Sequence, residues 1–274
     1  MTDFRNTVAI TGAGSGLGEA LAQRYASAGW RVAVTDQDPD RAQATLQKLL
    51  SASGAQAATD SQGSFALGLD VRDESQWAEL EQQVMQRWDG LMQLINNAGV
   101  ATAGTVIDTP QEDWDWVLDI NLLGAVRGCR RFAAVMQRQG EGQLVNMASF
   151  AGLAGAPGVS SYGVAKAGVV ALSEALRAEL HRSGVQVSVV CPAFVETRLT
   201  ETMRSTREGT GEQIQRWMKR SGVNATALAE QVFTDVAAGR FLILTHRETR
   251  WAWRLKRWWP ERYFKTLIRS VSKT

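Results

Sequence analysis

The chain is poor in the residues that build metal centres and disulfide frameworks. Its 274 residues include two cysteines and two histidines. Cys129 and Cys191 have no metal-like spacing, and His181 and His246 stand apart from any partner motif. We therefore expect no metal site and no disulfide, as is usual for a protein of the reducing cytoplasm.

Long apolar runs, leader-like segments and linkers are also missing. No stretch approaches the ~20 apolar residues of a membrane span. The first predicted strand starts at Thr7, which leaves no room for a signal peptide. The five prolines form no linker, and no internal repeat is found. These absences predict one domain over residues 1–245, followed by a short extension over 246–274.

What the sequence does contain is a glycine-rich turn between a predicted strand and a predicted helix. Residues 7–10 are apolar and β-branched, as in a buried parallel strand, and residues 19–28 read as a helix ending at Gly29. Glycines let the backbone approach a pyrophosphate, whose charge meets the free N–H groups at the helix start. The turn predicts a dinucleotide site made by Thr11, Gly12, Gly14, Ser15, Gly16, Leu17 and Gly18.

Asp36 indicates which dinucleotide is bound. It follows a second predicted strand over residues 31–35 and lies 18 positions after Gly18. An acid at an offset of roughly 20 residues binds the adenosine ribose hydroxyls. A 2′-phosphate beside it would be repelled by up to about 4 kcal/mol at about 4 Å. Ser15 and Gln37 offer no positive charge, so we expect NAD rather than NADP. The alternative is that Asp36 is only a solvated carboxylate at the end of a strand and binds no ribose.

Tyr162 and Lys166 form a second motif. Because they are four positions apart, they share one face of a helix. A nearby ammonium, together with the positive ring of an oxidised nicotinamide, would lower the pKa of the phenol from its ordinary value of about 10. The phenol could then give a proton to a developing alkoxide or take one from an alcohol. By itself, this spacing usually marks only a helix surface.

Strand-like and helix-like segments alternate along the chain. Later strands are predicted over residues 143–147, 186–190 and 240–244. A helix over 110–139 opens with the capping signature Thr109-Pro110-Gln111-Glu112. The alternation predicts an α/β fold, a single Rossmann-type doubly wound parallel sheet with helices on both faces. The helix of Tyr162 is apolar nearly all round, which indicates a second cover besides the sheet: another subunit or a loop of the same chain.

Together these motifs resemble the short-chain dehydrogenase/reductase family over about residues 5–245. The turn matches the family's cofactor loop at Thr11, Gly12, Gly16 and Gly18, and Asp36 matches its ribose-binding acid. The other matches are Asp70 and Val71 after a strand-like segment over 65–69, Asn96, Asn97, Ala98 and Gly99, Asn121, Ser149, Tyr162, Lys166, Pro192 and Thr197. Ala193 departs from the glycine that the family usually has after this proline, which affects the shape of the pocket wall.

The resemblance also implies roles. Asp70 and Val71 would contact adenine, and Thr197 would contact the nicotinamide carboxamide. The cofactor surface would be completed by Asn97, Ala98, Gly99, Tyr162, Lys166, Pro192 and Val195. The family's catalytic four would be Ser149, orienting the substrate oxygen; Tyr162, the general acid and base; Lys166, binding ribose and lowering the tyrosine pKa; and Asn121, holding a water that links the lysine to solvent.

In this family, residues 193–223 would form a lid over the substrate. The bulky side chains there are Phe194, Leu199, Met203, Ile214, Trp217 and Met218. They favour a lipophilic substrate, unless they only pack the lid onto the body of the protein.

The extension over 246–274 is the unusual part of the sequence. It holds nine Lys or Arg against Glu248 and Glu261, in a chain whose net charge is +2, and four of the ten tryptophans. Tryptophans at helical spacing among basic residues suit an anionic membrane surface, so we expect either peripheral membrane contact through 249–271 or docking on the protein or a neighbouring subunit. Nucleic-acid binding is not expected, since the rest of the chain is acidic.

We therefore predict an NAD(H)-preferring oxidoreductase that interconverts an alcohol with its carbonyl compound. It would act as a homodimer or homotetramer, in the cytoplasm or at the inner face of a membrane. Long-chain alcohols or aldehydes, retinoid- or steroid-like molecules and 3-oxoacyl derivatives all fit. The competing enzyme is an NADP-dependent 3-oxoacyl reductase. A cofactor-binding sensor or scaffold is the alternative that is not an enzyme, and the intact catalytic four count against it.

Overall fold

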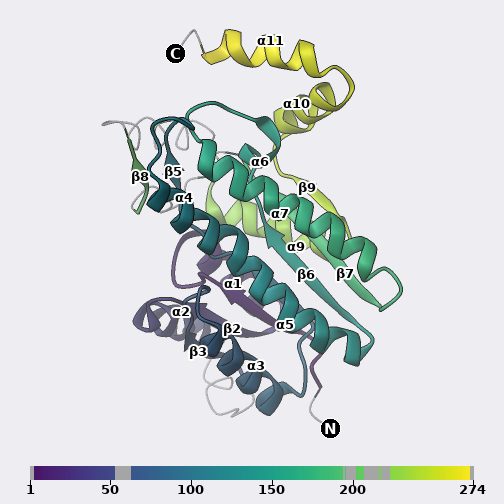
Figure 1. The fold of residues 1–274 in the computed structure, drawn as a ribbon. Helices are drawn as coiled ribbons and strands as arrows, with labels where there is room; N and C mark the ends of the chain where they lie inside the picture. Colours follow the sequence, from purple (N-terminus) through teal and green to yellow (C-terminus); the bar gives the residue numbers. More distant parts are fainter. Residues whose placement is uncertain are drawn as a thin grey trace.

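The computed structural model describes residues 3–52, 63–193, 195, 202–206, 216 and 223–271. In this part of the chain, seven strands form one parallel sheet in the order β3-β2-β1-β4-β6-β7-β9 (Figure 1). They are β1 (Thr7–Thr11), β2 (Arg31–Asp36), β3 (Phe65–Gly68), β4 (Gln93–Asn96), β6 (Gly142–Met147), β7 (Val185–Cys191) and β9 (Leu242–Leu244). A separate pair joins β5 (Thr102–Ala103) to β8 (Arg204–Ser205).

Helices cover both faces of the sheet, as Figure 1 shows. One face carries α1 (Gly16–Ser27), α2 (Pro39–Ala52) and α9 (Ala225–Ala237), and the other α3 (Glu74–Trp88), α5 (Gly124–Gln139) and α7 (Ser160–Glu179). Alternate residues of β1 serve the two cores: Val8 and Ile10 pack with α1, while Ala9 packs on the opposite side. The predicted doubly wound α/β fold is confirmed.

The strand order places one crevice at the centre of the sheet. β1 pairs with both β2 and β4, so the order reverses between β1 and β4. In open α/β sheets, ligands bind outside the carboxyl ends of the strands at such a switch point. The glycine turn follows β1 directly, at this edge of the sheet.

The segment predicted as a single helix over residues 110–139 is interrupted. α4 (Gln111–Leu118) and α5 are joined by a π-helical turn, Asp119–Leu123. The predicted capping box is wrong: Pro110 occupies the cap position and makes no side-chain bond. The Thr109 hydroxyl instead donates to the carbonyl of Thr105, because it belongs to the preceding turn.

α7 is only partly covered. Ala165, Val169 and Val170 are buried, whereas Val164 is 51% exposed. The expected second subunit over this helix therefore stays a prediction.

The predicted helical extension is present as α10 (Arg247–Trp258) and α11 (Pro260–Val271). Pro260 begins the second helix, as proline at a first helical position does. Figure 1 places the pair at one end of the molecule, beside the short helix α6 (Ala151–Ala154). Among the described residues, none of the helices has the length and apolar character to cross a bilayer.

Candidate active site

The glycine turn is bonded to the segment that follows β4. Thr11 Oγ1 accepts hydrogen bonds from the backbone N–H groups of Asn97, at 3.0 Å, and Ala98, at 2.9 Å. Gly12 has a φ of +64°, and a Cβ there would lie 2.9 Å from Ala98 Cα. Only glycine fits this close approach. Ser15 caps α1 without a side-chain bond, which leaves N–H groups of the first turn available to an anion.

Asp36 lies at the end of β2 and lines the same cleft. Its side chain is held by two backbone donors, Gly14 N to Oδ2 at 3.0 Å and Asp38 N to Oδ1 at 3.1 Å. The carboxylate is 7% exposed. Its position is thus fixed by the glycine turn that it faces.

Arg41 corrects the expectation that this carboxylate has no basic neighbour. It lies in the first part of α2, lines the cleft beside Asp36, and its Nε lies 3.2 Å from Asp38 Oδ2. A Cβ added at Gly14 would meet Arg41 Cβ at 2.7 Å and Asp36 Oδ2 at 2.8 Å. Position 41 was not predicted as a neighbour of Asp36, because it approaches the glycine turn only through the helix that begins at Pro39.

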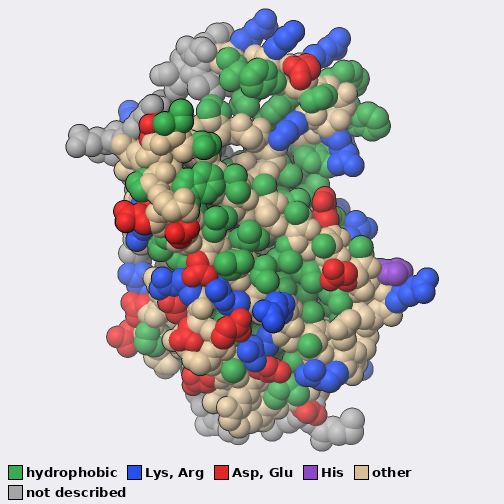
Figure 2. All heavy atoms as spheres, in the orientation of Figure 1, with side chains coloured by type: hydrophobic (Ala, Val, Ile, Leu, Met, Phe, Trp, Pro, Cys, Tyr) green, Lys and Arg blue, Asp and Glu red, His purple; other side chains and the backbone are tan. Residues whose placement is uncertain are grey.

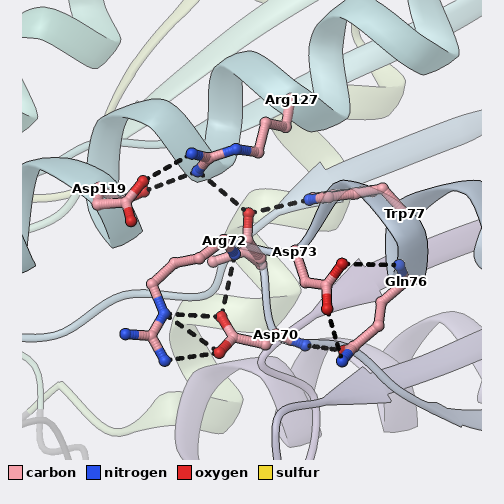
Figure 3. Close-up of polar contacts among 8 residues, drawn as sticks. Asp70, Arg72, Asp73, Gln76, Trp77, Asp119 and Arg127 are labelled. Carbon is pink, nitrogen blue, oxygen red and sulfur yellow. Dashed lines mark hydrogen bonds and ion pairs between the residues drawn. The ribbon is translucent and has the colours of Figure 1, made fainter.

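The loop after β3 is fixed by contacts from two helices (Figure 3). Asp70 N donates to Gln76 Oε1 at 2.6 Å, and the carbonyl of Val71 accepts from Trp77 Nε1 at 3.0 Å. Arg127 of α5 also reaches this carbonyl. Both Asp70 and Val71 line the cleft, as their predicted place beside adenine requires.

Arg72 is a neighbour of Asp70 that belongs to none of the predicted motifs. Its guanidinium lies 2.6 Å from Asp70 Oδ2 and also bonds to Oδ1 (Figure 3). This hydrogen-bonded ion pair lowers the pKa of Asp70 and raises that of Arg72. Asp70 therefore stays a carboxylate acceptor at neutral pH.

Asn121 lies inside the π-helical turn and is 2% exposed. Its Oδ1 accepts from Val100 N and its Nδ2 donates to Val100 O, both at 2.8 Å. A Cβ at Gly99 would lie 3.1 Å from Asn121 Oδ1 and 3.4 Å from Lys166 Nζ. Asn121, Gly99 and Lys166 therefore converge, although they come from three separate segments.

Lys166 projects from α7 into the same region. Its Nζ donates to the carbonyl of Met147 at 2.8 Å, and its side chain is 5% exposed. Burial lowers the pKa of Lys166 to about 8.

Ser149 and Tyr162 complete this end of the cleft. Burial raises the pKa of Tyr162, and a hydrogen bond with Ser149 acts in the opposite direction. Lys166 Nζ lies 6.0 Å from the centroid of the Tyr162 ring and is bonded to Met147. The lowering of the Tyr162 pKa expected from this ammonium together with an oxidised nicotinamide stays a prediction. Ser149 Oγ also accepts from Ala151 N at 3.1 Å, which orients the hydroxyl.

The cleft joins the two predicted motifs. It is lined by the turn residues Gly12, Ser15, Gly16, Leu17 and Gly18, by Asp36, Asp70, Val71, Asn97, Ala98 and Gly99, and by Ser149, Tyr162, Lys166, Pro192 and Val195. Ile120, Thr202 and Leu228 also line it and had no motif that could have identified them. Thr197 lies outside the described residues, as do Phe194, Leu199, Ile214, Trp217 and Met218 of the predicted lid.

One described part of the segment predicted as a lid is anchored to the body. β8 pairs with β5, and Arg204 of β8 forms an ion pair with Asp113 Oδ1 at 3.0 Å. The Arg204 guanidinium also lies 4.0 Å from the centroid of the Trp116 ring. α4 therefore holds this point of the segment in place.

Residues 6–208 match the protein-family model described as short chain dehydrogenase. This chain belongs to the short-chain dehydrogenase/reductase family. A relative from Lactiplantibacillus plantarum, the CLA biosynthesis dehydrogenase/reductase, is 31% identical over 267 residues, covering 90% of this chain and 91% of that protein. The 3-oxoacyl-[acyl-carrier-protein] reductase FabG of Thermotoga maritima is 31% identical over 194 residues, covering 71% of this chain and 76% of the other.

A solved structure agrees over nearly the whole length. The short-chain dehydrogenase/reductase of Burkholderia phymatum in complex with NAD has a TM-score of 0.83 and 31% identity, covering 94% of this chain and 95% of that one. This protein is therefore an oxidoreductase of a family that uses NAD(P), and its cleft lies where the fold places the dinucleotide.

Proposed function

We propose that this enzyme transfers a hydride between NAD(H) and the alcohol or carbonyl group of a lipophilic substrate. The main observation in support is that one cleft contains both the glycine turn with Asp36 and the group of Ser149, Tyr162 and Lys166. When bound, the nicotinamide supplies or accepts the hydride.

The residues at the dinucleotide end fit such a group. Gly12 keeps the turn close to Ala98, and the start of α1 offers N–H groups to the pyrophosphate. Asp36, held by Gly14 and Asp38, would accept from the adenosine ribose hydroxyls.

The residues at the other end handle the proton. Tyr162 would donate to the carbonyl oxygen during reduction and accept from the alcohol during oxidation, while Ser149 holds that oxygen. Lys166 would bind the nicotinamide ribose and supply positive charge near the phenol. Each polar atom of the Asn121 side chain bonds to Val100, and the water expected at Asn121 would link Lys166 to solvent.

The lining of the cleft supports a lipophilic substrate. The apolar residues of the lining include Ala193, Val195, Ile120 and Leu228. None of these side chains offers a hydrogen bond to a sugar-like molecule. The FabG relative, named for a 3-oxoacyl substrate, is consistent with an acyl chain here.

Arg41 supports a second candidate, an NADP-dependent 3-oxoacyl reductase. A guanidinium beside Asp36 could bind a 2′-phosphate and offset the repulsion from the carboxylate. We favour NAD, because Asp36 is buried with two backbone bonds, whereas the Arg41 side chain is 50% exposed and paired with Asp38.

The test is the oxidation of NADH and NADPH, side by side, with aldehydes, ketones and 3-oxoacyl thioesters of graded chain length. The proposal expects a preference for NADH and a kcat/KM that rises with chain length. A preference for NADPH with the 3-oxoacyl compounds would favour the second candidate. Binding of NADH without turnover of any carbonyl would leave the sensor or scaffold as the better description.

A further inference from the structure

The extension has an inner face that is bound to the protein. Lys256 Nζ donates to the carbonyl of Leu153 at 2.6 Å, and Tyr263 Oη donates to the carbonyl of Ala154 at 2.8 Å. Tyr263 is 9% exposed, and Trp253 packs on the cluster that contains Ala148. Docking of the extension on the protein was one of the two alternatives expected from the sequence. The contacts of the inner face show this docking. It involves α6, only a few residues beyond Ser149.

Docking leaves a second set of apolar side chains uncovered. We call this set the outer face: Trp251 is 64% exposed, Trp258 72%, Trp259 54%, Phe264 56% and Ile268 42%. Trp251 and Trp258 are two turns apart on α10, and Phe264 and Ile268 are one turn apart on α11. Exposed tryptophans gathered in this way mark an interaction surface.

Basic side chains surround the outer face. α10 and α11 contain eight Lys or Arg against Glu248 and Glu261. Those at positions 254, 257, 262, 265 and 269 are exposed, and the described residues give none of them a carboxylate partner. Figure 2 shows hydrophobic and basic side chains interleaved over this end of the molecule.

We propose that the outer face binds the surface of an anionic lipid bilayer, with α10 and α11 lying on the membrane. Tryptophan rings sit at the headgroup level and lysine and arginine bind anionic headgroups, which is the combination seen here. The described helices do not cross a membrane, so the association is with the surface.

The positive charge around the outer face disfavours a second copy of the chain as its partner. A symmetric dimer through this face would bring the same cationic patch from each copy together, and like charges in contact oppose association. An anionic bilayer supplies the opposite charge and an apolar phase for the rings at once.

The same helices connect this surface with the substrate end of the cleft. The outer face binds lipid while Lys256 and Tyr263, on the inner face, hold the carbonyls of α6 after Ser149. A lipophilic substrate would then be taken up near the membrane in which it dissolves. This advantage rests on the proposed function, whereas the membrane binding itself does not.

The experiment is flotation of the full-length protein with phosphatidylcholine vesicles, with and without phosphatidylserine, in the absence of any substrate. We expect at least ~10-fold stronger binding to the anionic vesicles at low salt and a loss of that difference at high salt. The variant Trp258→Ala/Trp259→Ala/Phe264→Ala should lose at least ~10-fold in binding. Ile107→Ser, which removes a 93% exposed apolar side chain elsewhere, should not.

A charge comparison completes the test. Lys265→Glu/Arg269→Glu should abolish the preference for anionic vesicles, and Arg130→Glu/Arg182→Glu, a reversal of two exposed arginines elsewhere, should leave it intact. Equal binding of wild type to both kinds of vesicle, or undiminished binding of the tryptophan variant, would refute the proposal. So would a dimer in light scattering that dissociates in the tryptophan variant, since a second copy would then occupy the face. Thermal unfolding and NADH binding of every variant show whether the fold and the cofactor site persist, independently of turnover.

Discussion

Lys166 Nζ donates a hydrogen bond to the backbone carbonyl of Met147, 2.8 Å away, and so joins α7 to the end of β6. The bond holds an ammonium group in a site where it is 5% exposed. Burial of this charge has a cost that depends on pH, which can be measured.

We expect the Lys166→Met variant to gain stability over the wild type near neutral pH and to lose that gain as pH rises. The Lys166 ammonium titrates at about 8 in the folded chain and at 10.5 ordinarily. Between these values the unfolded chain binds the proton and the folded chain does not, so the free energy of unfolding of the wild type rises with pH. The difference in the free energy of unfolding between Lys166→Met and the wild type should change by about 3 kcal/mol between pH 8 and pH 10.5, measured by urea unfolding.

The control for this series is Lys48→Met, which removes a lysine whose side chain is 59% exposed. If the stability difference between Lys166→Met and the wild type did not vary from pH 8 to 10.5, burial of the Lys166 ammonium would have no free-energy cost.

Tyr162→Phe should lower kcat by at least ~10²-fold, because the proton of the reacting oxygen then has no acid or base in reach. NADH binding should stay within a few-fold of the wild type, measured by fluorescence titration. Phenylalanine keeps the ring and removes only the hydroxyl, so a large loss of NADH binding would mean that Tyr162 is structural.

Asp36→Ala should narrow the preference for NADH over NADPH by at least ~10-fold in kcat/KM, since the repulsion of a 2′-phosphate is removed. Arg41→Ala should act in the opposite direction and further weaken the use of NADPH. The two variants serve as controls for one another. An unchanged ratio in Asp36→Ala would place this carboxylate outside the ribose site.

Gly14→Ala should weaken NADH binding by at least ~10-fold without a backbone penalty. Gly14 does not have a positive φ, but its added Cβ would meet Asp36 Oδ2 at 2.8 Å and Arg41 Cβ at 2.7 Å, so both side chains must move. Gly68→Ala is the matched control, because its Cβ would lie 3.5 Å from Pro39 Cβ, an ordinary contact. Equal binding of NADH by Gly14→Ala and Gly68→Ala would show that the position of Asp36 does not affect cofactor binding.

The sequence predicted the sheet, the glycine turn and the convergence of Tyr162 with Lys166, because each depends on short-range pattern and on the shared edge of parallel strands. It did not predict Arg41, whose place depends on where α2 begins. It also did not predict that burial raises the pKa of Tyr162, since the cost of burial is a property of the folded surroundings. For the extension, helical spacing identified the apolar residues, but only the fold divides them between the inner and the outer face.

The π-helical turn at Asn121 has a consequence for the rotational phase of the two helices that it joins. An α-helix advances about 100° per residue, so one additional residue in a turn shifts every later side chain by that angle. Val117 of α4 and Phe132 of α5, on either side of this turn, are both fully buried. Deleting one residue from 119–123 would restore a regular helix, and α5 would then have to rotate about its axis or give up its buried face. Asn121, whose side chain binds Val100, thus also lies in the turn where the rotational phase of the helix changes.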